Sequence, residues 1–147
     1  MPVPQGLLSS PGFLLAMVGA ESRKRWVEGL ARWETRPSQF AALMVLGERG
    51  PISQRDLAGL IGVDPRNLVT LVDSLEDRGL IARRPHPRDR RRHAVELTPA
   101  GRRFLRQLQR NGAAVERDLL AALDDSERAV LGRLLLKLLP TVTTKAD

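Results

Sequence analysis

Hydrophobic residues recur along most of the chain at steps of three and four, which is the spacing of amphipathic helices. Side chains that commonly cap a helix mark three of the helix starts: Ser53, Asp64 and Thr98. Proline follows the last two, at the first helical position, where its missing amide donor costs nothing. The predicted helices are residues 12–33, 37–47, 53–62, 64–79, 98–123 and 124–140.

The hydrophobic period changes to two between the fourth and fifth predicted helices. Residues 80–83 are short and extended, and residues 93–97 alternate between apolar and polar side chains. An arginine-rich stretch that contains Pro85 and Pro87 separates them. This pattern predicts a β-hairpin with a long basic tip. The short helix, the tight turn at Gly62 and the following helix predict a helix-turn-helix, so the hairpin would be its wing.

Positive charge is concentrated in this predicted wing. The 147-residue chain has a net charge of +7, and residues 83–92 hold six arginines against one aspartate, which leaves only +2 for the rest. A focused basic patch attracts polyanions, most often nucleic acid. A solvated loop and a disordered basic arm are the alternatives, but the prolines and the alternation favour a shaped hairpin. Residues 51–103 lack aromatic side chains, which disfavours single-stranded DNA or RNA as the partner.

The second helix of a helix-turn-helix enters the major groove with its N-terminal end first. The outward positions at that end are Pro65, Arg66, Asn67 and Thr70. Arginine pairs with guanine and asparagine with adenine, so these positions are predicted to read base edges. Acidic residues in the second half of the helix, such as Asp73, would repel phosphate, and we expect that half to tilt away from DNA.

The wing arginines divide into three predicted groups. Arg88, Arg90 and Arg92 are expected to contact DNA at the tip, in the minor groove or on phosphates. Asp89 and Arg91 are expected to form an ion pair that shapes the turn, although aspartate also favours turns by itself. Arg83 and Arg84, at the base, either reach phosphate or are simply solvated.

Several classes of function are disfavoured by what the sequence lacks. It has no cysteine and only two histidines, so we expect no disulfide, metal site or cofactor. It has no glycine-rich phosphate loop and no nucleophile with a histidine base, so an enzyme is not expected. No apolar run is long enough to cross a membrane, and the N-terminus does not resemble a signal peptide, which together predict a cytoplasmic protein.

Three stretches, taken in order, resemble a known family: LVDSLEDRGLI (71–81), DRR (89–91) and LTPAG (97–101). With the helix-turn-helix and wing around them, residues 12–139 resemble the MarR family of bacterial transcriptional regulators. The resemblance implies an α+β, predominantly α-helical fold, a winged helix-turn-helix with dimerisation helices at both ends. The DNA-binding lobe would span 36–98, and the dimerisation helices would span 11–35 and 99–140.

The resemblance also implies a homodimer that binds a pseudo-palindromic operator in double-stranded DNA, usually as a repressor that a small phenolic or anionic ligand releases. Arg66, Asn67 and Thr70 would be recognition positions, and Asp89 and Arg91 the wing signature. The wide apolar stripe of residues 128–139 independently favours a dimer. The alternative is a ligand-independent or architectural DNA-binding protein. A ligand would lie between the dimer helices and the lobe, where the following aromatic residues are candidates to line a pocket or, alternatively, plain core: Phe13, Trp26, Trp33 and Phe40.

Overall fold

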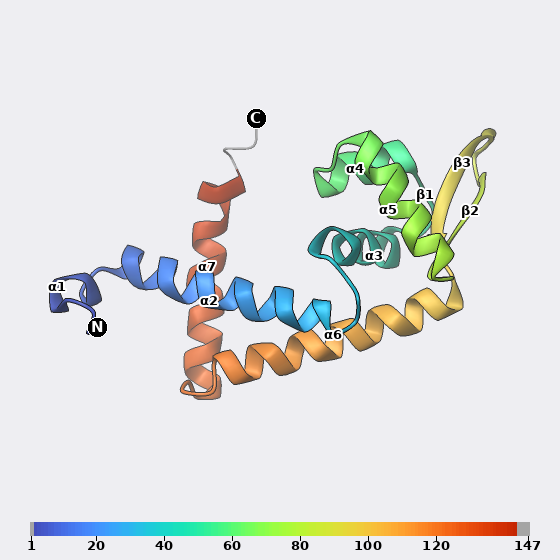
Figure 1. Ribbon diagram of the computed structural model, residues 1–147. Helices are drawn as coiled ribbons and strands as arrows, with labels where there is room; N and C mark the ends of the chain where they lie inside the picture. Colours follow the sequence, from blue (N-terminus) through green and yellow to red (C-terminus); the bar gives the residue numbers. More distant parts are fainter. Residues whose placement is uncertain (1, 144–147) are drawn as a thin grey trace.

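A computed structural model describes residues 2–143 of the protein (Figure 1). The described chain is mostly helical and contains one small antiparallel sheet, as predicted. Its elements in order are α1 (Gln5–Leu8), α2 (Pro11–Ala31), α3 (Pro37–Arg49), β1 (Ile52–Ser53), α4 (Gln54–Ile61), α5 (Pro65–Asp77), β2 (Ile81–His86), β3 (Asp89–Leu97), α6 (Pro99–Leu119) and α7 (Asp125–Thr143).

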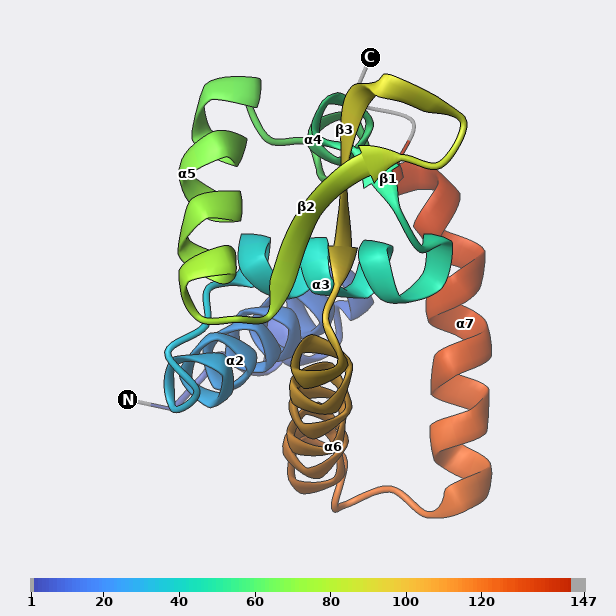
Figure 2. The same ribbon diagram turned by 90° about the vertical axis from the view of Figure 1, so that its right-hand side faces the viewer.

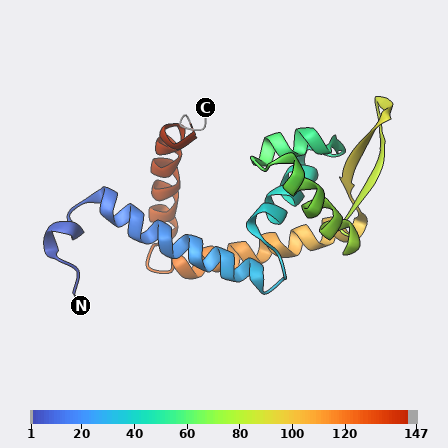
Figure 3. The ribbon, with the colours of Figure 1, turned by 45° about the horizontal axis from the view of Figure 1, so that its top comes forward.

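The helices fall into two groups. The helices α3, α4 and α5 and the sheet form a lobe at one end of the molecule, while α2 and α6 pack side by side and extend away from it (Figures 1 and 3). The last helix, α7, follows the end of α6 that lies away from the lobe and runs crosswise to the two long helices (Figure 1). The chain therefore has a lobe, a pair of long helices and an outlying helix.

Local capping fixes the helix-turn-helix as the sequence predicts. The Ser53 hydroxyl accepts a hydrogen bond from the amide of Asp56 at 3.1 Å, at the start of α4. Gly62 ends that helix in the left-handed conformation, with φ of 67°, which favours glycine. Asp64 accepts a bond from the Arg66 amide at 2.8 Å, and Pro65 occupies the first position of α5. These contacts hold α4 and α5 at a fixed turn.

The strands of the wing reach further toward its tip than predicted, although their register shifts between Pro85 and His86. Its strands extend to His86 and Asp89, so the long basic tip was wrong: only Pro87 and Arg88 lie between the strands. The sheet order is β1-β3-β2, which makes β2 an edge strand. An edge strand tolerates proline, and Pro85 stays in register opposite His93. The two-residue strand β1 was not predicted because it is too short to show a period.

The helix α6 begins in direct contact with the base of the wing. Thr98 caps it by accepting a hydrogen bond from the Gly101 amide at 3.0 Å, and its hydroxyl donates to the Gly79 carbonyl at 2.6 Å. A Cβ atom at Gly101 would lie 1.9 Å from the carbonyl oxygen of Leu80, so only glycine permits this approach. The glycine of the LTPAG stretch is thus explained by packing.

The hydrophobic core lies inside the lobe and continues to α6. Side chains from its helices and sheet are almost inaccessible to solvent, among them Leu43, Leu57, Leu68, Leu75 and Val95. In contrast, no residue of α7 from Asp125 to Pro140 is buried. Within residues 2–143, no helix has the length and hydropathy of a membrane span.

One short helix was missed, and the predicted ends of the last two helices were wrong. The short α1 was not predicted, and α6 ends at Leu119 rather than near Leu123. The helix α7 continues past Pro140 to Thr143. Proline lacks an amide donor and its ring crowds the carbonyl four residues before it, which disfavours a helix but does not end this one.

Candidate nucleic-acid interface

The N-terminal half of α5 presents polar side chains to solvent. Pro65, Arg66, Asn67 and Thr70 are exposed, whereas Leu68 between them is buried in the core. Seen from the side, the start of α5 and the turn of the β2–β3 hairpin lie at the same end of the lobe, uppermost in Figure 2. The residues predicted to read bases and those predicted to contact the DNA backbone therefore lie at the same end of the lobe.

Asp89 shapes the wing, but not through the partner predicted for it. Its carboxylate accepts a hydrogen bond from the backbone amide of Arg91 at 3.0 Å and lies 3.7 Å from the Nε of Arg92. The predicted ion pair with the Arg91 side chain was wrong. The aspartate holds the backbone two residues ahead, as aspartate does in turns, and its charge faces Arg92 instead.

This arrangement changes which wing arginines are available. Arg88, Arg90 and Arg91 are exposed, and their guanidinium groups form no ion pair or hydrogen bond with any side chain described, those of residues 2–140. Pro85 pairs with His93 and His86 with Asp89, so Arg90, Arg91 and Arg92 lie in an irregular part of β3, opposite no strand partner of their own. The wing thus carries available guanidinium groups near its tip.

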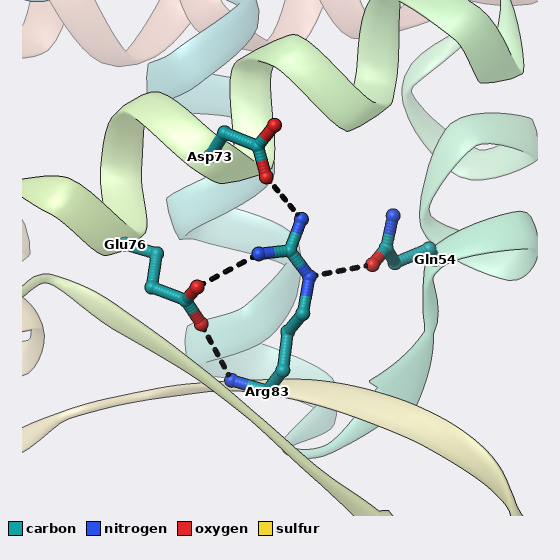
Figure 4. A network of polar contacts seen from close by, with 4 residues as sticks. All are labelled: Gln54, Asp73, Glu76 and Arg83. Atoms are coloured by element: carbon teal, nitrogen blue, oxygen red, sulfur yellow. Dashed lines mark hydrogen bonds and ion pairs between the residues drawn. The ribbon is translucent and has the colours of Figure 1, made fainter.

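Arg83 has a different role from the tip arginines. Figure 4 shows its guanidinium between α4 and α5, the predicted recognition helix. There it contacts Asp73 at 2.5 Å, Glu76 at 2.8 Å and Gln54 at 2.9 Å. Its own amide also donates to Glu76 at 3.1 Å. The hydrogen bond that its guanidinium donates to Asp73 raises the pKa of Arg83 above its ordinary value, against the smaller effect of partial burial.

These contacts change two expectations: the role of Arg83 and Arg84 at the base of the wing, and the repulsion of DNA by the acids of α5. Arg83 neither reaches out toward phosphate nor is simply solvated, and Arg84 pairs with Glu96 at 2.5 Å. Asp73 and Glu76, expected from the sequence to repel DNA, are compensated by Arg83. The sequence contained a signal for this pairing: the two acids lie three residues apart on α5, the helix that directly precedes the strand of Arg83.

Two of the four candidate ligand-pocket residues lie together. The rings of Trp26 and Phe40 pack edge to face, 5.9 Å apart, and line a cavity of about 260 Å³ between α2, α3 and α6. Trp26 also lines a neighbouring, mainly apolar cavity of about 550 Å³ toward α7. Trp33 instead packs on Phe104 at 6.4 Å. Phe13 lies about 20 Å along α2 from Trp26, at 1.5 Å per residue.

Side-chain clusters that would hold a metal ion are not found among residues 2–143. The interface described above depends on charge and hydrogen-bond donors from the protein itself.

The fold and this interface define a winged helix-turn-helix DNA-binding protein. Residues 36–93 match the MarR family. The multiple antibiotic resistance protein MarR of Salmonella typhimurium is 32% identical over 130 residues, 88% of this chain and 90% of that protein. A putative transcriptional regulatory protein for the hcr operon of Thauera aromatica is 35% identical over 102 residues, and the match spans 69% of this chain and 61% of that protein.

The solved structures agree with these relatives. The crystal structure of CouR from Rhodococcus jostii RHA1, bound to p-coumaroyl-CoA, is 29% identical, covers 92% of this chain and 95% of that one, and superposes with a TM-score of 0.69. The chain belongs to the MarR family of transcriptional regulators, which bind DNA and act as dimers.

Proposed function

We propose that this protein is a homodimeric repressor that binds a pseudo-palindromic operator and is released by a small aromatic ligand. In this proposal residues 36–98 form the DNA-binding lobe, and residues 11–35 and 99–140 form the dimerisation helices. The observation that carries the proposal is the exposure of Arg66, Asn67 and Thr70 at the same end of the lobe as the wing arginines.

The division of labour between these residues follows from their chemistry. Arg66 and Asn67 offer hydrogen-bond patterns that match base edges in the major groove, so they would supply specificity. The exposed wing arginines would supply charge that does not depend on sequence, on phosphates or in the minor groove. Arg91 joins this second group, because its side chain is not held by Asp89.

A second copy of the chain best accounts for the exposed apolar surface. On α7, Val130, Leu134, Leu135 and Leu136 are between 39% and 68% exposed. Further exposed apolar side chains on α1 and α2 include Leu8, Leu15 and Val18. Apolar patches of this kind on a soluble protein mark an interface. A two-fold dimer would also place two recognition helices about one DNA turn apart, roughly 34 Å.

The proposed ligand site is the pair of cavities that Trp26 separates. The smaller cavity has walls from α2 and α6 on the dimerisation side and from α3 on the lobe side, so an occupant would contact both parts. The larger cavity has walls from α2, α6 and α7. CouR, which superposes on this chain, binds p-coumaroyl-CoA. An aromatic group is expected here because the lining near Trp26 and Phe40 is largely apolar.

Footprinting on DNA from the protein's own genomic neighbourhood tests the proposal. We expect a short, dyad-symmetric footprint, whereas coating that grows with DNA length would support the architectural alternative. Arg66→Ala should relax sequence preference. Arg90→Ala should weaken binding to all sequences alike and lower the salt slope by about 1 for each phosphate that is no longer neutralised. Arg110→Ala, which removes one charge from an exposed position on α6, is the control. An unchanged salt slope in Arg90→Ala would refute the role of the wing.

A further inference from the structure

Arg78 connects the end of the recognition helix to both long helices. It follows α5 directly, as its C-cap. One terminal nitrogen donates to the carbonyl oxygen of Glu34 at 3.0 Å, and the other donates to that of Trp33 at 3.1 Å. The same group lies over the ring of Phe104 on α6, 5.0 Å from its centre.

The carbonyls that Arg78 binds belong to the turn between α2 and α3. This turn joins the long helices to the lobe. Glu34 has φ of 49°, a left-handed conformation that a residue with a side chain adopts only when its surroundings hold it. The amides of Trp33 and Thr35 both bond to the Leu30 carbonyl, at 2.9 and 3.1 Å, and close the helix end. The end of a helix carries partial negative charge, so a cation stabilises it.

The chemistry of this contact requires arginine. A planar guanidinium can donate to two adjacent carbonyls and stack on a ring at the same time. Lysine offers a point charge on a flexible stem, so it would satisfy one carbonyl and lose the stack. Trp33 extends the cluster, because its ring meets Phe104 edge to face. One side chain thus joins α5, the end of α2 and the start of α6.

We infer that Arg78 is a positioning residue that fixes the angle between the recognition helix and the dimerisation helices. In the dimer that we propose above, this angle sets the distance between the two recognition helices. Arg78 therefore determines the half-site spacing that the protein accepts. Without it, the end of α5 loses its hydrogen bonds to the turn between α2 and α3 and its contact with Phe104, while Thr98 still joins α6 to the base of the wing.

Binding to duplexes with different distances between the half-sites distinguishes this role from a merely structural one. Duplexes that the wild-type protein selects from a random library are rebuilt with one base pair added to or removed from the centre. Arg78→Gln should lose on the order of tenfold in affinity for the best spacer and bind the three lengths almost equally. Arg78→Lys should have an affinity and a spacer preference between those of the wild type and Arg78→Gln. If Arg78 instead contacted phosphate, the salt slope would fall by about 1 and the spacer preference would remain, which would overturn the inference.

A distance measurement tests the same point without DNA. The chain has no cysteine, so a spin label at Val69→Cys, an exposed position on α5, is unique. Pulsed EPR measures the distance between the spin labels of the two subunits. The Val69→Cys protein, the parent, should give one narrow distance, and the same protein with Arg78→Gln should give a broadened distribution. Arg32→Gln is the matched control, because it removes one arginine from an exposed site at the same end of α2.

The two proposals fail in different ways. A parent protein that selects no dyad-symmetric DNA contradicts the proposed function, while the label distances still decide the role of Arg78. An Arg78→Gln variant with the parent's spacer preference and an unbroadened label distance overturns the Arg78 inference alone. Equal broadening in Arg32→Gln would overturn it as well.

Discussion

Gly101 is the position where a single added methyl group should have the largest effect on stability. A Cβ atom there would lie 1.9 Å from the carbonyl oxygen of Leu80 and 2.9 Å from its carbonyl carbon. Even a close C–H···O contact needs about 3.3 Å between carbon and oxygen, so α6 and the base of the wing must separate by about 1 Å or more. The Leu80 atoms belong to the backbone and the position of a Cβ is fixed by its own backbone, so no rotamer change relieves the clash.

The expected cost follows from the contacts that this separation breaks. Thr98 joins α6 to the wing through its amide, which donates to Leu80 at 3.1 Å, and through its hydroxyl, which donates to Gly79 at 2.6 Å. Each hydrogen bond contributes about 1 kcal/mol, and overpacking a tight contact costs about 1–3 kcal/mol. Alanine regains about 1 kcal/mol in helix propensity. Gly101→Ala should therefore lower the free energy of unfolding by about 3 kcal/mol.

Urea unfolding at one fixed protein concentration measures this decrease, since the midpoint of a dimer depends on concentration. Gly59→Ala on α4 is the control: the same change is made at an exposed helical position, with no atom within 4 Å of the added Cβ. It should be neutral or stabilising by up to about 1 kcal/mol. The reasoning fails if Gly101→Ala unfolds within about 0.5 kcal/mol of the wild type, or if both variants are destabilised equally.

Two further changes test the dimer surface and the base of the wing. Leu136→Asp places a charge on the most exposed leucine of α7, and sedimentation at micromolar concentration should show monomers, whereas a dimer like the wild type would exclude this surface from the interface. Arg83→Gln leaves Asp73 and Glu76 uncompensated beside the DNA, so affinity should fall about tenfold, with partial recovery when Asp73→Asn is added. Equal affinity in Arg83→Gln and the wild type would contradict that account.

The helix-turn-helix could be predicted from the sequence because its determinants are local. Ser53 and Asp64 cap helices within three residues of themselves, and Gly62 ends one by its own backbone conformation. The same holds for Thr98 at the start of α6. Such signals depend on neighbouring residues only, and they place α4 and α5 correctly without knowledge of the packing.

The partners of the wing charges could not be predicted in the same way. Arg84 meets Glu96 across two strands, so this contact depends on strand register. Asp89 lies near Arg92, three residues on in the same strand, instead of the predicted Arg91, and the hairpin has an irregularity at this point that no local pattern reveals. The position of Arg78 over Phe104 joins residues 26 apart in sequence, and it required the relative placement of three helices.

Only some of the six arginines of residues 83–92 are available to DNA, and this limits how much the wing can add to the salt dependence of DNA affinity. Arg83 and Arg84 are neutralised by acids at the base of the wing, which leaves Arg88, Arg90, Arg91 and Arg92 at its outer part. Two wings of four arginines, each releasing one counterion, would give a salt slope no steeper than about −7. The pairing of Asp89 with Arg92 lowers that limit further. A steeper measured slope would therefore require phosphate contacts outside the wing, and the six arginines of residues 83–92 are not six equivalent DNA contacts.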